Sequence, residues 1–413
     1  MGMRWQRQRR SARQALTAGL ALAAVLAAAA CGGSADAGRA AGGADDPTAS
    51  TGGRLSAPAE VADAFDPEHA VAAPGPLKLP LLSADLLVVD DRTIGDDELA
   101  RLRKVPGVRE VTPLSIASLA IEDRALTVAA VDPDTYRRST QVQVAQATAI
   151  WKRLAGGEIF VSPALRDTLP ITDDGYLQLG PDDPTPHIGA FAPQVPSVDL
   201  VVDEAWGRTL GMTPGNAVLI STGMAAPDRV RRGIARIVPA GSSIQGLDAV
   251  ARYGLDPDAV QTAVVVGGVS DAVGTYSYRV VGGRVVPDAG WVASHIATEP
   301  VPILGSMTCN TAIFPQLRAA LEEIVQRGLA SKIHVGEYAG CFYPRFIAGT
   351  TTLSNHAFGL AFDLNVPGNQ RGTVGEMDRT VVSIFKKWGF AWGGDWSYTD
   401  PMHFELARLV RPD

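Results

Sequence analysis

The chain has 413 residues, a formal net charge of −7 and 46% hydrophobic residues. This acidic balance disfavours nucleic acid as a partner, because binding to a polyanion needs a basic surface. The apolar content also excludes a chain that is disordered throughout its length.

The N-terminal residues 1–31 have the features of an export signal. Five arginines and no acidic residue precede an apolar run over residues 15–30, which is interrupted only by Thr17. This pattern is typical of a secretory signal peptide, and the run is shorter than the roughly 20 residues that span a bilayer. Cys31 follows three alanines and resembles the lipidated cysteine of a bacterial lipobox. We expect an exported protein of the cell envelope, lipid-anchored at Cys31 on the outer face of the cytoplasmic membrane; plain signal cleavage is the alternative.

Residues 32–76 are rich in small and polar residues and contain almost no aromatic or large aliphatic side chains. Such a segment cannot build a core, so we predict a flexible, disordered tether. Residues 77–280 are too apolar to belong to this tether. Their first predicted elements are a strand, a helix and two further strands. This order predicts a separate α+β domain with helices on one sheet face. The expected strands are 84–90, 108–114, 126–132, 216–223, 234–240 and 263–269, and the expected helices are 96–105, 148–157 and 204–212.

Residues 281–413 are expected to form a C-terminal α+β domain with a small, mainly antiparallel sheet. A hairpin over 277–286 is expected to open it, since its paired glycines suit a two-residue turn between alternating strands. A helix from about Pro315 has apolar residues on one face and ends at Gly328. The same helical spacing predicts a second helix over 376–388.

Two short segments near the C-terminus carry a candidate metal site. His356 and Asp363 lie in a stretch that predicts a turn followed by a buried strand, and His403 lies in a neighbouring apolar strand. Two imidazoles and one carboxylate suit a catalytic zinc ion, because three protein ligands leave the fourth tetrahedral position free for water. Asp400 precedes His403 closely enough to take a proton from that water.

These residues resemble the signature of a known family. The patterns S-x-H-x-x-G-x-A-x-D at 354–363 and D-x-x-H-F at 400–404 resemble the D-Ala-D-Ala carboxypeptidase and L-Ala-D-Glu endopeptidase family of zinc peptidases. The likeness is to VanY-like members of the LAS group, which trim peptidoglycan stem peptides. It covers roughly residues 285–410 and nothing before them.

The resemblance implies a role for each residue of the signature. It makes His356, Asp363 and His403 the ligands of Zn²⁺, Asp400 the general base, and Arg345 the cation that holds the substrate and stabilises the oxyanion. Many carboxypeptidases of the family have glutamate as the base and tryptophan before the second histidine, whereas this chain has Asp400 and Met402. That departure is closer to the endopeptidase branch, so the bond that is cleaved stays open.

Further residues are expected around the signature. Ser354 and Trp396 are candidates to line the substrate pocket. Asp395 and Glu405 are candidates to orient a histidine ring, with an ordinary salt bridge as the alternative for both. The cysteines that remain in the exported chain, Cys309 and Cys341, are expected to form a disulfide, with two buried thiols as the alternative.

The sequence therefore predicts a zinc peptidase that hydrolyses peptidoglycan stem peptides. Its expected partners are those peptides and, through the lipid anchor, the membrane. The domain at 77–280 is expected to bind an envelope protein or the wall, or to hold the C-terminal domain in place. The alternatives are a wall-binding or scaffold lipoprotein with a vestigial metal site and a peptidase that acts on a non-wall peptide.

Overall fold

The computed structural model describes residues 65–180 and 183–412, all within one compact unit. The expected signal peptide, the lipidated Cys31 and most of the expected tether lie outside the described residues. No helix in the described part of the chain has the length and hydropathy needed to cross a membrane.

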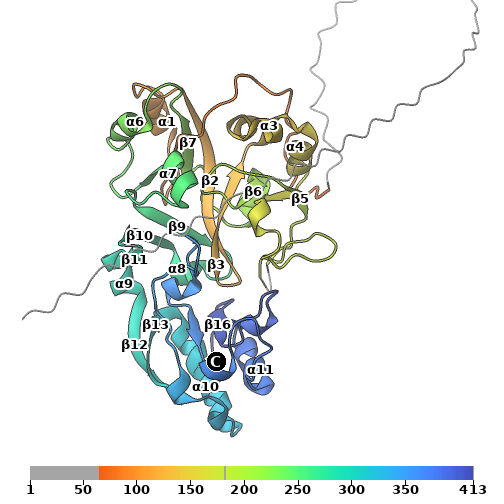
Figure 1. The fold of residues 1–413 in the computed structure, drawn as a ribbon, viewed down its shortest axis with the longest axis vertical. Helices are drawn as coiled ribbons and strands as arrows, with labels where there is room; N and C mark the ends of the chain where they lie inside the picture. The colour runs from red at the N-terminus through yellow and green to blue at the C-terminus, as the bar shows by residue number, and fades with distance from the viewer. Residues whose placement is uncertain (1–64, 181–182, 413) are drawn as a thin grey trace, which may run out of the picture. The chain divides into compact units, whose positions relative to one another are not determined.

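An eleven-stranded sheet organises the first two thirds of the described chain (Figure 1). Its main path runs β11-β10-β9-β2-β3-β6-β4-β5, and β7 branches from β2 to pair with β1, which in turn pairs with β8. The strands are β1 (Leu86–Val89), β2 (Glu110–Ile121), β3 (Arg124–Val131), β4 (Ile159–Val161), β5 (Ile188–Phe191), β6 (Leu200–Asp203), β7 (Ala217–Ser221), β8 (Ser243–Gly246), β9 (Gln261–Val266), β10 (Thr275–Val281) and β11 (Arg284–Pro287).

Short helices connect these strands. They are α1 (Asp96–Leu102), α2 (Pro133–Tyr136), α3 (Val142–Gln146), α4 (Thr148–Ala155), α5 (Glu204–Thr209), α6 (Pro227–Ile234), α7 (Leu247–Tyr253) and α8 (Ser270–Val273). The predicted strand over 234–240 is wrong: Ile234 ends α6, and the residues after it form turns. Pro227 in the first turn and the spacing of the buried Val230 and Ile234 favour a helix, and Pro239 has no N–H to give to a sheet.

The described C-terminal part contains two small sheets and three α-helices. One sheet pairs β12 (Ile296–Val301) with β13 (Gly305–Asn310), and the other has the order β14-β16-β15. Its strands are β14 (Ala361–Asp363), β15 (Phe390–Trp392) and β16 (His403–Leu406), and the helices are α9 (Ala289–His295), α10 (Phe314–Gln326) and α11 (Arg379–Lys387). The α+β class and the small antiparallel C-terminal sheet are thus confirmed.

The helices α10 and α11 cover the core of this part. Leu317, Leu321 and Ile324 repeat at helical spacing along α10 and are completely buried. The second helix begins three residues later than the sequence suggested, because the Asp378 side chain accepts a hydrogen bond of 2.8 Å from the Thr380 N–H and so caps its first turn.

The hairpin β10–β11 belongs to both parts. Gly282 and Gly283 form its turn with positive φ, as expected, but β10 pairs with β9 and so extends the large sheet. Tyr276 and Val285 of this hairpin are buried in the same hydrophobic cluster as the C-terminal helices. The expected boundary at 280/281 falls inside this hairpin, and the core is continuous across it.

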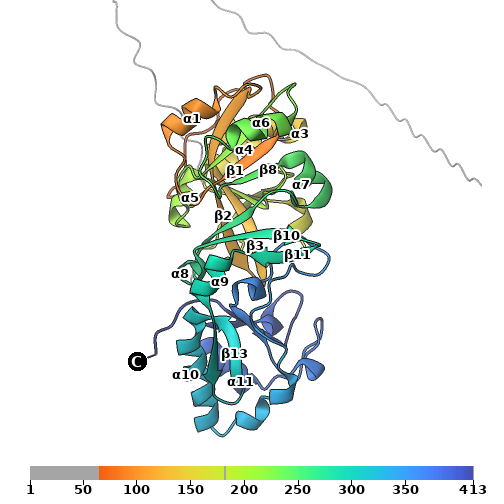
Figure 2. The same cartoon turned by 90° about the vertical axis from the view of Figure 1, so that its left-hand side faces the viewer.

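A second hairpin, β2–β3, also reaches the C-terminal part. Both views show it extending from the sheet to the segments coloured blue (Figure 1 and Figure 2). Its strands pair up to Ile121 and Arg124, which leaves Glu122 and Asp123 as a two-residue turn with φ of 46° and 59°. The Ala125 N–H next to this turn donates a hydrogen bond of 3.1 Å to the Leu353 carbonyl, just before the candidate site.

Candidate metal centre and active site

The strand pair β14–β16 places two of the candidate ligands opposite each other. Asp363 ends β14, His403 begins β16, and the antiparallel register pairs these two residues directly. Buried aromatic side chains from both strands, Phe362 and Phe404, stack below them with ring centroids 5.7 Å apart. The alternation of side chains along each strand therefore directs the polar ligands to one face and the phenylalanines to the core.

A single turn of 3₁₀ helix, Asn355–Phe358, carries His356. The Ser354 hydroxyl caps this turn by accepting from the His356 N–H at 3.3 Å. Gly359 ends it with a φ of 68°, and a side chain there would collide with the backbone nitrogen of Asn310. The His356 Nδ1 lies 2.9 Å from the Cys341 carbonyl oxygen, which fixes the ring and leaves Nε2 facing Asp363.

The three side chains converge on one point. His356 Nε2 lies 3.3 Å from Asp363 Oδ2, and His403 Nδ1 lies 3.2 Å from Asp363 Oδ1. One donor atom of each residue falls within 4.8 Å of the others. Two buried atoms of the group, His356 Nε2 and Asp363 Oδ1, have no hydrogen-bond partner among the described residues.

Unpartnered buried donor atoms are costly unless they bind something, and here they form a set that fits a metal ion. Two imidazole nitrogens and one carboxylate are the ligands of an open zinc site. His356 and His403 also have a fixed second ring nitrogen, against the Cys341 carbonyl and the Glu405 carboxylate respectively. Such outer contacts orient metal-binding histidines.

Charge dominates this site. Burial by itself raises the pKa of Asp363, but the adjacent His356 and His403 outweigh it and hold that pKa well below the usual range. Burial lowers the pKa of His403, yet the carboxylates of Asp123, Asp363 and Glu405 reverse the effect and raise it well above the ordinary value. The carboxylates thus stabilise positive charge on His403, and the histidines stabilise negative charge on Asp363.

Asp400 lies in the tight turn that precedes β16. Its N–H donates a hydrogen bond of 2.7 Å to the Gly393 carbonyl, and its own carbonyl accepts a hydrogen bond of 3.0 Å from the His403 N–H. Its Oδ1 is buried without a hydrogen-bond partner, and its Oδ2 lies 3.9 Å from Nε of Arg371. Burial raises the pKa of Asp400, and the nearby Asp363 adds to the rise while His403 and Arg371 oppose it. A raised pKa suits a residue that exchanges protons.

Arg345 and Trp396 lie next to the ligand segments. The Arg345 carbonyl accepts a hydrogen bond of 3.2 Å from the Ser354 N–H, so its backbone runs beside the turn that carries His356. The ring of Trp396 lies 5.0 Å from the ring of His403, between centroids. Within the described residues, the half-buried guanidinium of Arg345 has no ion pair, which leaves it available to an anionic group.

Two expectations need correction. Ser354 is completely buried, and its hydroxyl donates 2.6 Å to Asp123 Oδ1, so it has no surface to offer a substrate. Asp395 is about half exposed and pairs with Lys386 at 2.5 Å, which is the ordinary salt bridge considered as its alternative. Of the two candidates to orient a histidine, Glu405 is the one in contact: its Oε2 lies 3.0 Å from His403 Nε2.

Sequence reasoning missed Asp123, which reaches the site from the β2–β3 turn. It lies 231 residues before Ser354, its hydrogen-bond partner, and no spacing rule connects positions so far apart. The only local signal is the tight turn between two apolar strands. That signal predicts the hairpin but not what the turn touches.

Cys309 and Cys341 lie at disulfide-bonding distance, as the sequence predicts. Cys309 belongs to β13, and the Cys341 carbonyl is the group that holds the His356 ring. The pair therefore ties the loop behind this ligand to the two-stranded sheet.

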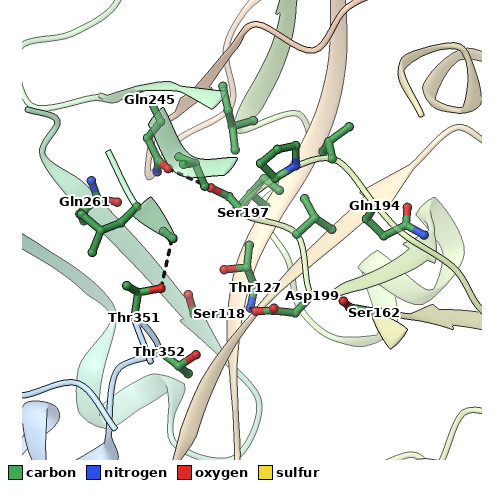
Figure 3. Close-up of a pocket in the computed structure, with 18 of the residues that line it drawn as sticks. Ser118, Thr127, Ser162, Gln194, Ser197, Asp199, Gln245, Gln261, Thr351 and Thr352 are labelled. Atoms are coloured by element: carbon green, nitrogen blue, oxygen red, sulfur yellow. Dashed lines mark hydrogen bonds between the residues drawn. The ribbon is translucent and has the colours of Figure 1, made fainter. Parts of the chain in front are cut away.

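A separate cavity of about 570 Å³ lies beside the segment that leads to His356 (Figure 3). Thr351 and Thr352 line it, and the Thr351 hydroxyl donates 3.1 Å to the Gly254 carbonyl. Of the described residues that line it, Asp199 is the one with a charged side chain, and burial raises its pKa to about 6. Its other polar lining includes Ser118, Ser162, Gln194, Gln245 and Gln261. The candidate metal ligands are not among these residues.

The comparisons with known proteins address the C-terminal part alone. Residues 348–406 match the family described as D-alanyl-D-alanine carboxypeptidase, a peptidase family. The match begins after Arg345 and includes all three candidate ligands, Asp400 and Glu405. No curated protein matches the chain. The segment that carries the site is therefore similar to a peptidase of the cell wall.

Proposed function

We propose that this protein is a zinc-dependent peptidase that hydrolyses the stem peptides of peptidoglycan. The observation that carries the proposal is the convergence of His356, Asp363 and His403, whose buried and unpartnered atoms are suited to a divalent ion. The ion would supply a Lewis acid and lower the pKa of a water molecule. The family match over 348–406 supports peptide hydrolysis as the reaction.

The residues around the ligands have distinct tasks in this proposal. Asp400 accepts the proton of the attacking water on its free Oδ1 and later gives it to the leaving amine, so its charge is restored after each turnover. Arg345 binds the substrate carboxylate or the carbonyl oxygen as negative charge develops there. Trp396 forms a wall beside His403.

The scissile bond belongs to the proposal as well. The family description names D-alanyl-D-alanine carboxypeptidase activity, whereas Asp400 and Met402 resemble the endopeptidase branch that cuts after L-alanine. Both reactions use the same water activation and differ in how the substrate is held.

Mass spectrometry of stem peptides incubated with the zinc-loaded protein tests the proposal. We expect His356→Ala to lower cleavage by several orders of magnitude, because a ligand is lost. His334→Ala is a matched control, since the His334 side chain is exposed, pairs with Glu337 and is not among the candidate ligands. Loss of one terminal D-alanine identifies a carboxypeptidase, and a cut after L-alanine identifies an endopeptidase. No cleavage by protein with bound zinc would contradict the proposal and favour the wall-binding alternative.

We also propose that the protein is exported and lipid-anchored through Cys31. The support is the arginine-rich, apolar N-terminal sequence and the alanines before Cys31. Fatty-acid labelling of the expressing cells tests this, since Cys31→Ser is expected to abolish the label, and an unlabelled wild-type protein would refute the anchor.

A further inference from the structure

The turn of the β2–β3 hairpin enters the C-terminal part beside the metal ligands. Asp123 is 4% exposed although it occupies a two-residue turn, a position that is normally open to water. Both turn residues have positive φ without being glycine, which costs energy that their contacts must offset.

Asp123 binds the segment that carries the first histidine. Its Oδ1 accepts a hydrogen bond of 2.6 Å from the Ser354 hydroxyl and one of 2.9 Å from the Asn355 N–H. These two residues directly precede His356, and Ser354 also caps the turn in which His356 lies. The Asp123 carboxylate therefore fixes the start of that turn.

The same residue binds the group that orients the second histidine. The Asp123 N–H donates to the Glu405 carboxylate, 3.1 Å from Oε2. That oxygen also accepts a hydrogen bond of 2.9 Å from the Asn355 side-chain amide, and it lies 3.0 Å from His403 Nε2. Asp123 Oδ1 is itself 4.0 Å from His403 Nε2. One turn residue thus contacts both ligand-bearing segments.

Asp123, His403 and Glu405 also lie close enough together to hold a metal ion by distance alone. Their hydrogen bonds favour another interpretation. Asp123 Oδ1 and Glu405 Oε2 accept from N–H and O–H groups, whereas His356 Nε2 and Asp363 Oδ1 have no partner. An ion belongs with the unpartnered set, and the partnered set supports it.

We propose that Asp123 is a positioning residue for the metal site, supplied by the hairpin of the preceding sheet, and that its side chain and N–H set the ligand geometry of His356 and His403. The inference rests on the proposed metal site. It gives the large α+β part a role in the reaction: the C-terminal sequence holds the ligands, and the hairpin holds them in place.

The test compares zinc affinity and kinetics in three full-length variants at pH 8. Asp123→Gly keeps a residue that tolerates positive φ but removes the bonds to Ser354 and Asn355. Asp123→Asn keeps an acceptor and removes the charge. Glu122→Gln is the matched control, because it removes a charge from the same turn and leaves the bonds of Asp123 intact.

We expect Asp123→Gly to weaken zinc affinity, measured against a competing chelator, by about 10- to 100-fold. Its kcat should fall while KM changes little, because substrate contacts are untouched. The zinc affinity and kcat of Asp123→Asn should lie between those of Asp123→Gly and the wild type. Both quantities should stay within about twofold of the wild type in Glu122→Gln. Circular dichroism of each variant verifies that it is folded, and a purely structural role would lower Tm without changing the zinc affinity of the folded protein.

Each outcome separates this inference from the proposed function. A folded Asp123→Gly protein that binds zinc as tightly as the wild type overturns the inference, even if stem peptides are cleaved. Weaker zinc binding in that variant with no cleavage by the wild type supports the inference and refutes the proposed function. A wild-type protein that binds no zinc refutes both.

Discussion

At the scale of single residues, Asp400 has the environment that most changes its chemistry. Its carboxylate is 14% exposed and has one unpartnered oxygen, and burial raises its pKa although the nearby His403 opposes the rise. A general base must be ionised, so activity is present above the pKa and is lost as pH falls through it. The raised pKa moves this loss to a higher pH than an ordinary aspartate would give.

Replacement of this residue gives the residue-scale prediction. We expect Asp400→Asn to lower kcat by about 10²- to 10⁴-fold, because the amide cannot accept the proton, with little change in zinc affinity. The pH profile of kcat/KM in the wild type checks the assignment. It should rise with pH on its acid side, and the residual activity of the variant should lack that rise. A variant that keeps both the rate and the acid limb would exclude Asp400 as the base.

At the scale of elements, the junction between β6 and α5 contains a carboxylate with a measurable effect on stability. Asp203 ends β6 and is completely buried. Its side chain caps α5 by accepting hydrogen bonds of 2.8 Å and 2.9 Å from the N–H groups of Ala205 and Trp206. Burial raises its pKa to about 7, although those N–H groups oppose the rise. Below the unfolded pKa both states are protonated, and above it ionisation favours the unfolded chain, so stability falls as pH rises toward 7.

The prediction compares Asp203→Asn with the wild type by urea unfolding at pH 4 and pH 8. Asparagine keeps the capping oxygen and has no charge to bury. The free energy of unfolding of the variant relative to the wild type should therefore increase between these pH values, by up to about 4 kcal/mol for a shift of about three units. A relative stability that is the same at both pH values would mean that Asp203 is not the buried acid that the fold indicates.

At the scale of the whole described molecule, one question is whether the large sheet and the C-terminal part unfold together. The hydrophobic cluster of the C-terminal helices continues into β9, β10 and β11, and the β2–β3 turn is buried against the ligand segments. Shared core residues make two parts cooperative, because neither can lose its packing alone.

Leu321→Ala tests this coupling. Leu321 is completely buried on α10, and its truncation should cost about 2 to 5 kcal/mol. If unfolding is cooperative, the opening free energy measured by hydrogen exchange of the slowest amides in β1 and β7 should fall by the same amount. These strands lie in other hydrophobic clusters of the large sheet. Unchanged protection in β1 and β7 would show two independently unfolding parts.

The sequence by itself determined the local elements of the site, because short-range patterns are sufficient for them. The turn at His356, the strand with Asp363 and the strand with His403 follow from apolar runs and from the glycines beside them. The helices α10 and α11 follow from helical spacing, but the start of α11 does not. The pattern is wrong at 234–240, where a short apolar run predicts a strand but follows directly on a helix that begins at Pro227.

Only the tertiary structure decided which distant groups surround these ligands. Asp123 comes from another sheet, and Ser354 bonds to that hairpin in place of a substrate. Chain folding brings such residues together across separations that leave no periodic trace in the sequence. The identity of the ligands is therefore a local property of the chain, whereas their orientation depends on packing between its two parts.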